Sequence, residues 1–280
     1  MIDVIKLVCC HYKNNISKNC YKRTLTDLLQ YYKDSNEKLF NAQKNLDDFV
    51  ESIIPINNIS AALLVNHKFT EFMMDTKEFY NNNNHKLSEC KYDPKSCTTQ
   101  FMDAINGIHD IYTKFIELKG RYKQIDDLIA NLYDYHKKQS TSKDIYCKFG
   151  IDGSGQLMCM LYNFNVNLTS SSTIYVFYGL RSSTRMFINY NPYRELYIMD
   201  FKSDISRQGY GAFVLTELPK IVQEINNRIK KNGYVSISPT DTITSIAGDI
   251  SPDGTISQQD LINFYDKYGY ISNNKLYKKV

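Results

Sequence analysis

The hydrophobic pattern of this 280-residue chain changes its period near residue 141, and this change constrains the fold more than any other feature. Before it, apolar residues recur at three- and four-residue steps over 21–54, 60–80 and 101–136, which predicts helices with one apolar face. The third segment is the most regular, and its spacing is typical of a heptad seam. We therefore predict a helical hairpin or bundle, resembling a coiled coil, over residues 1–141.

After residue 142 the chain alternates short runs rich in Tyr, Phe, Ile and Val with Gly, Asn, Ser or Pro, which predicts consecutive antiparallel strands. A strong helical pattern then covers 211–231, followed by a strand at 234–238, a polar loop, a helix over 258–267 and a last strand around 271–280. Residues 142–280 are thus expected to form a mixed α/β domain with a mostly antiparallel sheet, so that the whole chain is α+β. The predicted strands are 145–149, 156–166, 173–180, 186–190 and 195–201.

Composition narrows the class of protein. A hydrophobic content of 42% suffices for a core, and a net charge of +4 is too small to indicate a nucleic-acid partner. The seven cysteines are odd in number and scattered, which favours reduced thiols over a disulfide framework. Without a basic leader, and with no apolar run of about 18 residues, the sequence predicts a soluble, cytoplasmic protein away from membranes.

The N-terminal part carries no clear chemistry. His85, Cys90 and Cys97 have a spacing that suits metal ligands, but a fourth ligand and a Cys-x-x-Cys pair are missing, so we expect no metal there. The helical stripes are typical of a bundle core or a pairing surface. They predict self-association or a protein partner bound through the N-terminal helices.

Residues 201–214 have the most specific local chemistry in the chain. A β-prone run enters a short polar turn that contains Gly209 and Gly211, and an apolar helical pattern begins at once. Two glycines one residue apart allow a tight turn whose N–H groups point the same way, and a helix N-terminus attracts anions. The amides of residues 208–212 therefore form a candidate phosphate site.

Two motifs carry a resemblance to a known family. Residues 206–212, Ser-Arg-Gln-Gly-Tyr-Gly-Ala, follow a strand and open an amphipathic helix, and residues 263–270, Asn-Phe-Tyr-Asp-Lys-Tyr-Gly-Tyr, end a later helix. With the strand between them, they resemble the C-terminal half of GNAT-type acyl-CoA N-acyltransferases. The resemblance covers residues 195–280 well and 143–194 loosely, and it leaves residues 1–141 outside.

The resemblance implies transfer of an acetyl group from acetyl-CoA to a primary amine of an unknown acceptor, a small molecule or a protein. It places the pantetheine arm between strands that splay apart, here 196–201 and 234–238. Tyr265 would give a proton to the departing thiolate. An amine acceptor also requires a base, and Asp200 and Glu195 are the nearest carboxylates on the strand. The residues implied in binding acetyl-CoA are Phe201, Arg207, Gln208, Gly209, Tyr210, Gly211, Ala212 and Gln258.

Two departures from the family pattern support a different function. Ser206 stands where the family has Arg or Gln, and the region between 145 and 200 lacks the two helices that usually follow the first strand and shape the acceptor site. The alternative is therefore a non-catalytic binding or scaffold protein that retains a GNAT-like domain and acts through its N-terminal helices.

A calcium loop is a further alternative. Residues 249–260 fit the twelve-residue EF-hand spacing, with Gly254 at the sharp turn and a helix following. Pro252 and the closing Asp in place of Glu argue for a plain polar turn in which Ser257 caps the helix. The oxygen ligands in the calcium interpretation are Asp249, Ser251, Asp253, Thr255 and Asp260.

Overall fold

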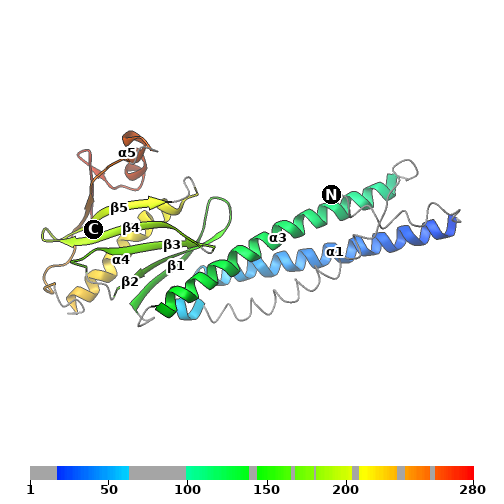
Figure 1. Cartoon of the computed structure of the whole chain (residues 1–280), viewed down its shortest axis with the longest axis horizontal. Coiled ribbons are helices and arrows are strands. Elements are labelled where there is room, and N and C mark those ends of the chain that lie inside the picture. Colours follow the sequence, from blue (N-terminus) through cyan, green and yellow to red (C-terminus); the bar gives the residue numbers. More distant parts are fainter. Residues whose placement is uncertain are drawn as a thin grey trace. The chain divides into compact units, whose positions relative to one another are not determined.

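The computed structural model describes residues 18–62, 99–138, 144–164, 168–179, 181–203, 208–231, 237–252 and 256–280 (Figure 1). Contacts divide the chain into two compact units, with residues 53–64 and 124–280 in the second and the remainder in the first. The long helix α3, Thr99–Lys138, contributes to both units. The domain boundary that we predicted between residues 141 and 142 stays a prediction.

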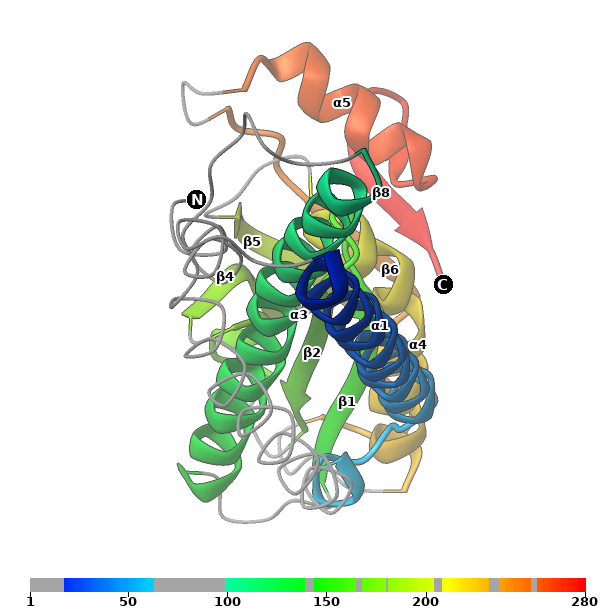
Figure 2. The ribbon, with the colours of Figure 1, turned by 90° about the vertical axis from the view of Figure 1, so that its right-hand side faces the viewer.

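In the first unit, helix α1, Lys18–Ile53, lies alongside α3 (Figures 1 and 2). Its buried side chains follow steps of four, three, four and three residues, at Ser35, Leu39, Ala42, Leu46 and Phe49. Tyr122 on α3 donates its hydroxyl to the carbonyl of Ala42 at 3.0 Å, which joins the two helices within this stripe. Helices over most of 21–54 and 101–136 are therefore confirmed, whereas most of the predicted helix 60–80 and the triad His85, Cys90 and Cys97 lie outside the described residues.

The second unit is built on an eight-stranded, mostly antiparallel sheet in the order β1-β2-β3-β4-β5-β6-β8-β7. The predicted α+β class is thus confirmed. The elements are β1 Ile145–Ile151, β2 Leu157–Asn163, β3 Ser172–Tyr178, β4 Arg181–Asn191, β5 Glu195–Ser203, α4 Tyr210–Lys230, β6 Ser245–Gly248, α5 Gln258–Lys267, β7 Ile271–Ser272 and β8 Lys275–Lys279.

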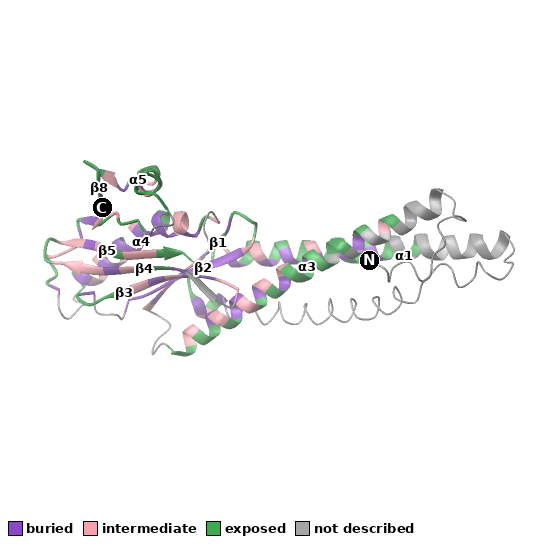
Figure 3. Ribbon diagram, turned by 45° about the horizontal axis from the view of Figure 1, so that its top comes forward, coloured by how far each residue is buried: buried purple, intermediate pink, exposed green. Residues whose placement is uncertain are grey.

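The sheet has two covered faces. Ile174 and Val176 of β3 belong to the same core cluster as the apolar side of α4. Tyr175 and Phe177 alternate with them and therefore point to the other face, where Tyr135 of α3 meets both rings edge-on at 5.9 and 5.7 Å. β2 is buried along its whole length, as expected of a strand between two apolar layers (Figure 3).

Two predictions for the C-terminal part are wrong. The stretch 240–257, predicted as a polar loop, contains β6, and described residues 237–238 of the predicted strand 234–238 are not in a strand. The last strand is instead a hairpin of β7 and β8, because Asn273 and Asn274 both adopt positive φ, 51° and 58°, and form a two-residue turn. The interior Pro219, by contrast, leaves α4 continuous.

Candidate functional site

The site is organised by a break in the sheet between β5 and β6, the one parallel pair among the described strands. Pairing runs from Glu195 opposite Ser245 to Ile198 opposite Gly248 and then stops. A Cβ on Gly248 would lie 2.9 Å from the Ile198 carbonyl oxygen, so only glycine fits at this last pair. Beyond it, the β5 backbone over 199–203 keeps β4 as its partner on one side and has no described strand on the other.

A bulge lies at the same point. Phe187 of β4 pairs with Asp200 and Ile188 pairs with Ile198, so Met199 is an extra residue in β5. Its side chain is 52% exposed. An extra residue bends the strand and increases its local twist, which explains why β5 and β6 diverge here.

The glycine turn leads from β5 into α4. Gly209 is the N-cap residue with φ 89°, a left-handed conformation that favours glycine. The first helical amides, from Tyr210 to Ala212, have no intrahelical acceptor, and Phe213 is the first to bond back, to the Gly209 carbonyl at 2.9 Å. The turn therefore presents N–H groups without an intrahelical acceptor at the positive end of α4, and the phosphate site there stays a prediction. Arg207 lies outside the described residues.

Gly211 has a structural reason to be small. A Cβ there would lie 3.1 Å from Phe264 of α5 and 3.5 Å from Phe201 of β5. The predicted site residues Phe201 and Gly211 are thus brought together with α5. The rings of Phe264 and Phe201 occupy the space that a side chain at Gly211 would need, so only the Gly211 backbone amide is available to an anion.

Tyr210 fixes the start of α4 to the β1–β2 hairpin. Its hydroxyl donates to Asp152 at 2.7 Å, and its ring stacks on Tyr178 with centroids 4.2 Å apart. The other carboxylate oxygen of Asp152 accepts from Ser154 and from the Gln156 amide, which closes the turn of this hairpin. Tyr210, the first residue of α4, is held by both a hydrogen bond and ring stacking. The amides at the start of α4 therefore point in a fixed direction.

Tyr265 is the candidate proton donor on α5. Its ring is buried, and burial, with a smaller effect from the Asp200 carboxylate, raises its pKa to about 12. Its hydroxyl makes no hydrogen bond to a described residue. The structure thus brings Tyr265 and Asp200, two of the predicted catalytic residues, close enough to interact electrostatically, and it keeps the phenol protonated at neutral pH.

The two candidate bases lie in different surroundings. Asp200 forms an exposed ion pair with Lys202 at 3.0 Å. Glu195 accepts from Asn191 at 2.8 Å and from Ser245 at 3.5 Å, and it lines a cleft together with Gln258, the predicted ligand residue at the start of α5. Asp200 is therefore the carboxylate that the structure associates with Tyr265.

The proposed calcium ligands have other roles where they are described. Asp249 accepts the Tyr197 hydroxyl at 2.6 Å, and Asp260 accepts from Ser257 while its own amide donates to the Ser257 hydroxyl. The predicted cap of α5 by Ser257 is confirmed. Residues 253–255 lie outside the described part of the chain, within which no group of three His, Cys, Asp or Glu forms a metal cluster.

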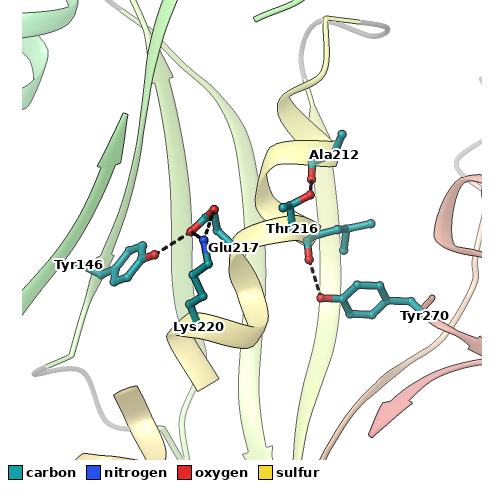
Figure 4. A network of polar contacts seen from close by, with 7 residues as sticks. Tyr146, Ala212, Thr216, Glu217, Lys220 and Tyr270 are labelled. Atoms are coloured by element: carbon teal, nitrogen blue, oxygen red, sulfur yellow. Dashed lines mark hydrogen bonds and ion pairs between the residues drawn. The ribbon is translucent and has the colours of Figure 1, made fainter. Parts of the chain in front are cut away.

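Sequence reasoning missed a buried polar network on α4. Glu217 is 5% exposed and accepts from Tyr146 of β1 at 2.9 Å and from Lys220 at 2.8 Å, while the Tyr270 hydroxyl donates to the Leu215 carbonyl at 2.7 Å (Figure 4). The detectable signal was a carboxylate on the apolar stripe of an amphipathic helix, where a charge needs a partner.

Two phenols, the half-buried Tyr146 and the buried Tyr210, predict a loss of stability in alkali. Burial, followed by hydrogen bonds to Glu217 and Asp152, raises the pKa of Tyr146 and of Tyr210 above the ordinary value of 10.0. Above pH 10 the unfolded chain loses these protons while the folded chain keeps them, so the free energy of unfolding should fall as pH rises. Urea titrations between pH 8 and 11.5 measure this fall, and Tyr146→Phe should make it shallower. An unchanged slope in this variant would contradict the assignment.

Comparisons with known proteins add no relative: no family model matches the chain, and neither characterised proteins nor solved structures give a match. Among the described residues, no helix combines the length and apolar character needed to cross a bilayer.

Proposed function

We propose that the second unit is an acyl-CoA-dependent N-acyltransferase domain that moves an acetyl group from acetyl-CoA to an amine. The observation that carries the proposal is the parallel pair β5 and β6, which is joined through the glycine turn and α4 and stops pairing at Ile198 and Gly248. The expectation from sequence was a pantetheine arm between two splayed strands. The second of these strands is β6, in place of the predicted 234–238.

The start of α4, the open edge of β5 and Tyr265 suit different parts of acetyl-CoA. The amides of residues 210–212 at the start of α4 would bind the pyrophosphate. The open edge of β5 over 199–203 offers backbone groups for the amides of an extended arm, in the way that a strand edge binds a peptide. Tyr265 would donate a proton to the thiolate as the carbon–sulfur bond breaks, and Asp200 would orient or activate the amine.

The acceptor side differs from the family pattern. Residues 152–156 between β1 and β2 are too few for the two helices expected after the first strand. An acceptor would therefore be bound by other elements of the chain.

Stabilisation by acetyl-CoA tests the proposal. A saturating ligand at 100 times its Kd stabilises the folded state by about 2.7 kcal/mol, which corresponds to roughly 5–10 °C in Tm. Ala212→Glu places a carboxylate in the first turn of α4, where it favours the helix but repels a pyrophosphate. We expect this variant to keep its Tm without ligand and to lose most of the shift with acetyl-CoA.

The matched control is Gln223→Glu, which adds the same charge at an exposed position of the same helix and should leave the shift intact. No shift of the wild-type chain with either acetyl-CoA or CoA would overturn the enzyme proposal and favour a scaffold that acts through its N-terminal helices. A shift produced by calcium alone, and lost in Asp253→Ala, would favour the calcium interpretation.

A further inference from the structure

A polar cleft of about 660 Å³ opens beside the point where β5 and β6 separate. It is lined by the first half of β5, by β6 and the residues after it, by the start of α5 and by the β7–β8 turn. Gly248 and Tyr197 belong both to the cleft wall and to the last paired stretch of the two strands. The cleft therefore lies next to the gap between the diverging strands, where one end of a ligand bound in that gap would lie.

Two carboxylates give the cleft its charge. Glu195 and Asp249 both line it, and neither has an ion pair with a described residue. Among the described residues Asp249 accepts one hydrogen bond, from Tyr197, and a carboxylate has room for several more. Lys275 is the single basic residue in the lining, which leaves the wall with one net negative charge.

The remaining wall can orient a polar ligand. Tyr197 keeps its proton because the hydrogen bond to Asp249, and to a lesser extent burial, raises its pKa to about 12. Its hydroxyl therefore donates to Asp249 and holds that carboxylate in place. Gln258 and Asn273 add amide groups that both donate and accept. Such a lining favours a small ligand with an ammonium group and a second polar end.

We propose that this cleft binds the amine acceptor in its ammonium form, with Glu195 and Asp249 as the charge partners, and that the acceptor is a small polar amine. The inference rests on the proposed function. In the reaction, R–NH₃⁺ loses a proton, its nitrogen bonds to the thioester carbonyl carbon, and the carbon–sulfur bond breaks. The products are the acetamide, the CoA thiol and one proton released to solvent, so atoms and charge balance.

Binding of 1,4-diaminobutane to the full chain tests the assignment without acetyl-CoA. We expect saturable binding by calorimetry at pH 7, with 1,4-butanediol, which has the same length and no charge, at least tenfold weaker. Replacing both carboxylates, in Glu195→Gln with Asp249→Asn, should weaken diamine binding at least tenfold. Asp266→Asn removes an exposed α5 carboxylate outside the cleft lining and is the matched control, expected to bind as the wild type does.

Three results would overturn the assignment: equal binding of diol and diamine, unchanged affinity in the double variant, or loss of diamine binding in Asp266→Asn as well. Circular dichroism and Tm of each variant show that it is folded, and Lys275→Ala, which removes the opposing charge, should tighten binding. If the diamine fails while acetyl-CoA still stabilises the chain, only the cleft assignment is lost. If acetyl-CoA fails in its own titration, the proposed function is lost, and with it the cleft's role as an acceptor site.

Discussion

Replacing Tyr265 with phenylalanine is expected to lower kcat for acetyl transfer by about 100-fold and to leave the KM for acetyl-CoA nearly unchanged. General acid catalysis by a positioned side chain contributes roughly 10²- to 10⁴-fold, and Phe keeps the buried ring while removing only the proton. The hydroxyl has no hydrogen bond to a described residue, so its loss leaves no protein partner unsatisfied there. CoA thiol release, with the amine that the wild-type chain acetylates fastest, measures the effect.

The control is Tyr268→Phe at the end of the same helix, which should change kcat less than twofold. The pH profile gives a second readout. Because burial and Asp200 raise the pKa of Tyr265 to about 12, the phenol stays protonated throughout an assay from pH 7 to 10. Loss of activity in that range must then come from another group. A Tyr265→Phe chain with wild-type kcat would remove the residue from the mechanism.

Leu218→Ala is expected to produce the largest loss of stability, about 2–5 kcal/mol. Leu218 is fully buried on the face of α4 that packs against the sheet, and truncation removes apolar contacts and leaves a cavity. Because α4 positions both the glycine turn and the buried network around Glu217, the loss should be accompanied by weaker acetyl-CoA binding. Denaturant unfolding monitored by tyrosine fluorescence and circular dichroism measures the change.

Thr216→Ala is the matched control for that experiment. Thr216 lies two residues earlier on the exposed side of α4, where its hydroxyl donates to the Ala212 carbonyl (Figure 4). Its removal should change stability by less than about 0.5 kcal/mol. Similar losses in both variants would mean that α4 is not held by its apolar face.

The strands from β1 to β5 could be predicted because each is a short run with apolar and aromatic residues that is bounded by turn residues. β6 could not, because Ser245–Gly248 has one large apolar residue, Ile246, in four positions. Its strand conformation depends on pairing with β5 on one side and β8 on the other. Tertiary context of this kind is invisible to local periodicity.

The candidate site likewise has parts that could be predicted from the sequence and parts that could not. The glycine turn could be predicted from two glycines one residue apart after a β-prone run, and Tyr265 was implied by the resemblance to GNAT-type acyltransferases. In the structure Gly211 lies beside Phe201 and Phe264, and the Phe264 ring meets the Tyr265 ring at 5.4 Å. Glu195 and Asp200 lie on the same face of β5 because Met199 is an extra residue, and this bulge is defined only by the register with β4. The cleft was missed because its wall comes from five elements, β5, β6, α5, β7 and β8, that converge only after folding.

The end of pairing at Ile198 also leaves a strand edge inside the sheet. Unpaired strand edges are templates on which other chains can add, and proteins commonly protect them with charged side chains. On this stretch of β5, Asp200 and Lys202 form an exposed ion pair. The same charges that border the proposed binding gap therefore also guard the chain against edge-to-edge aggregation.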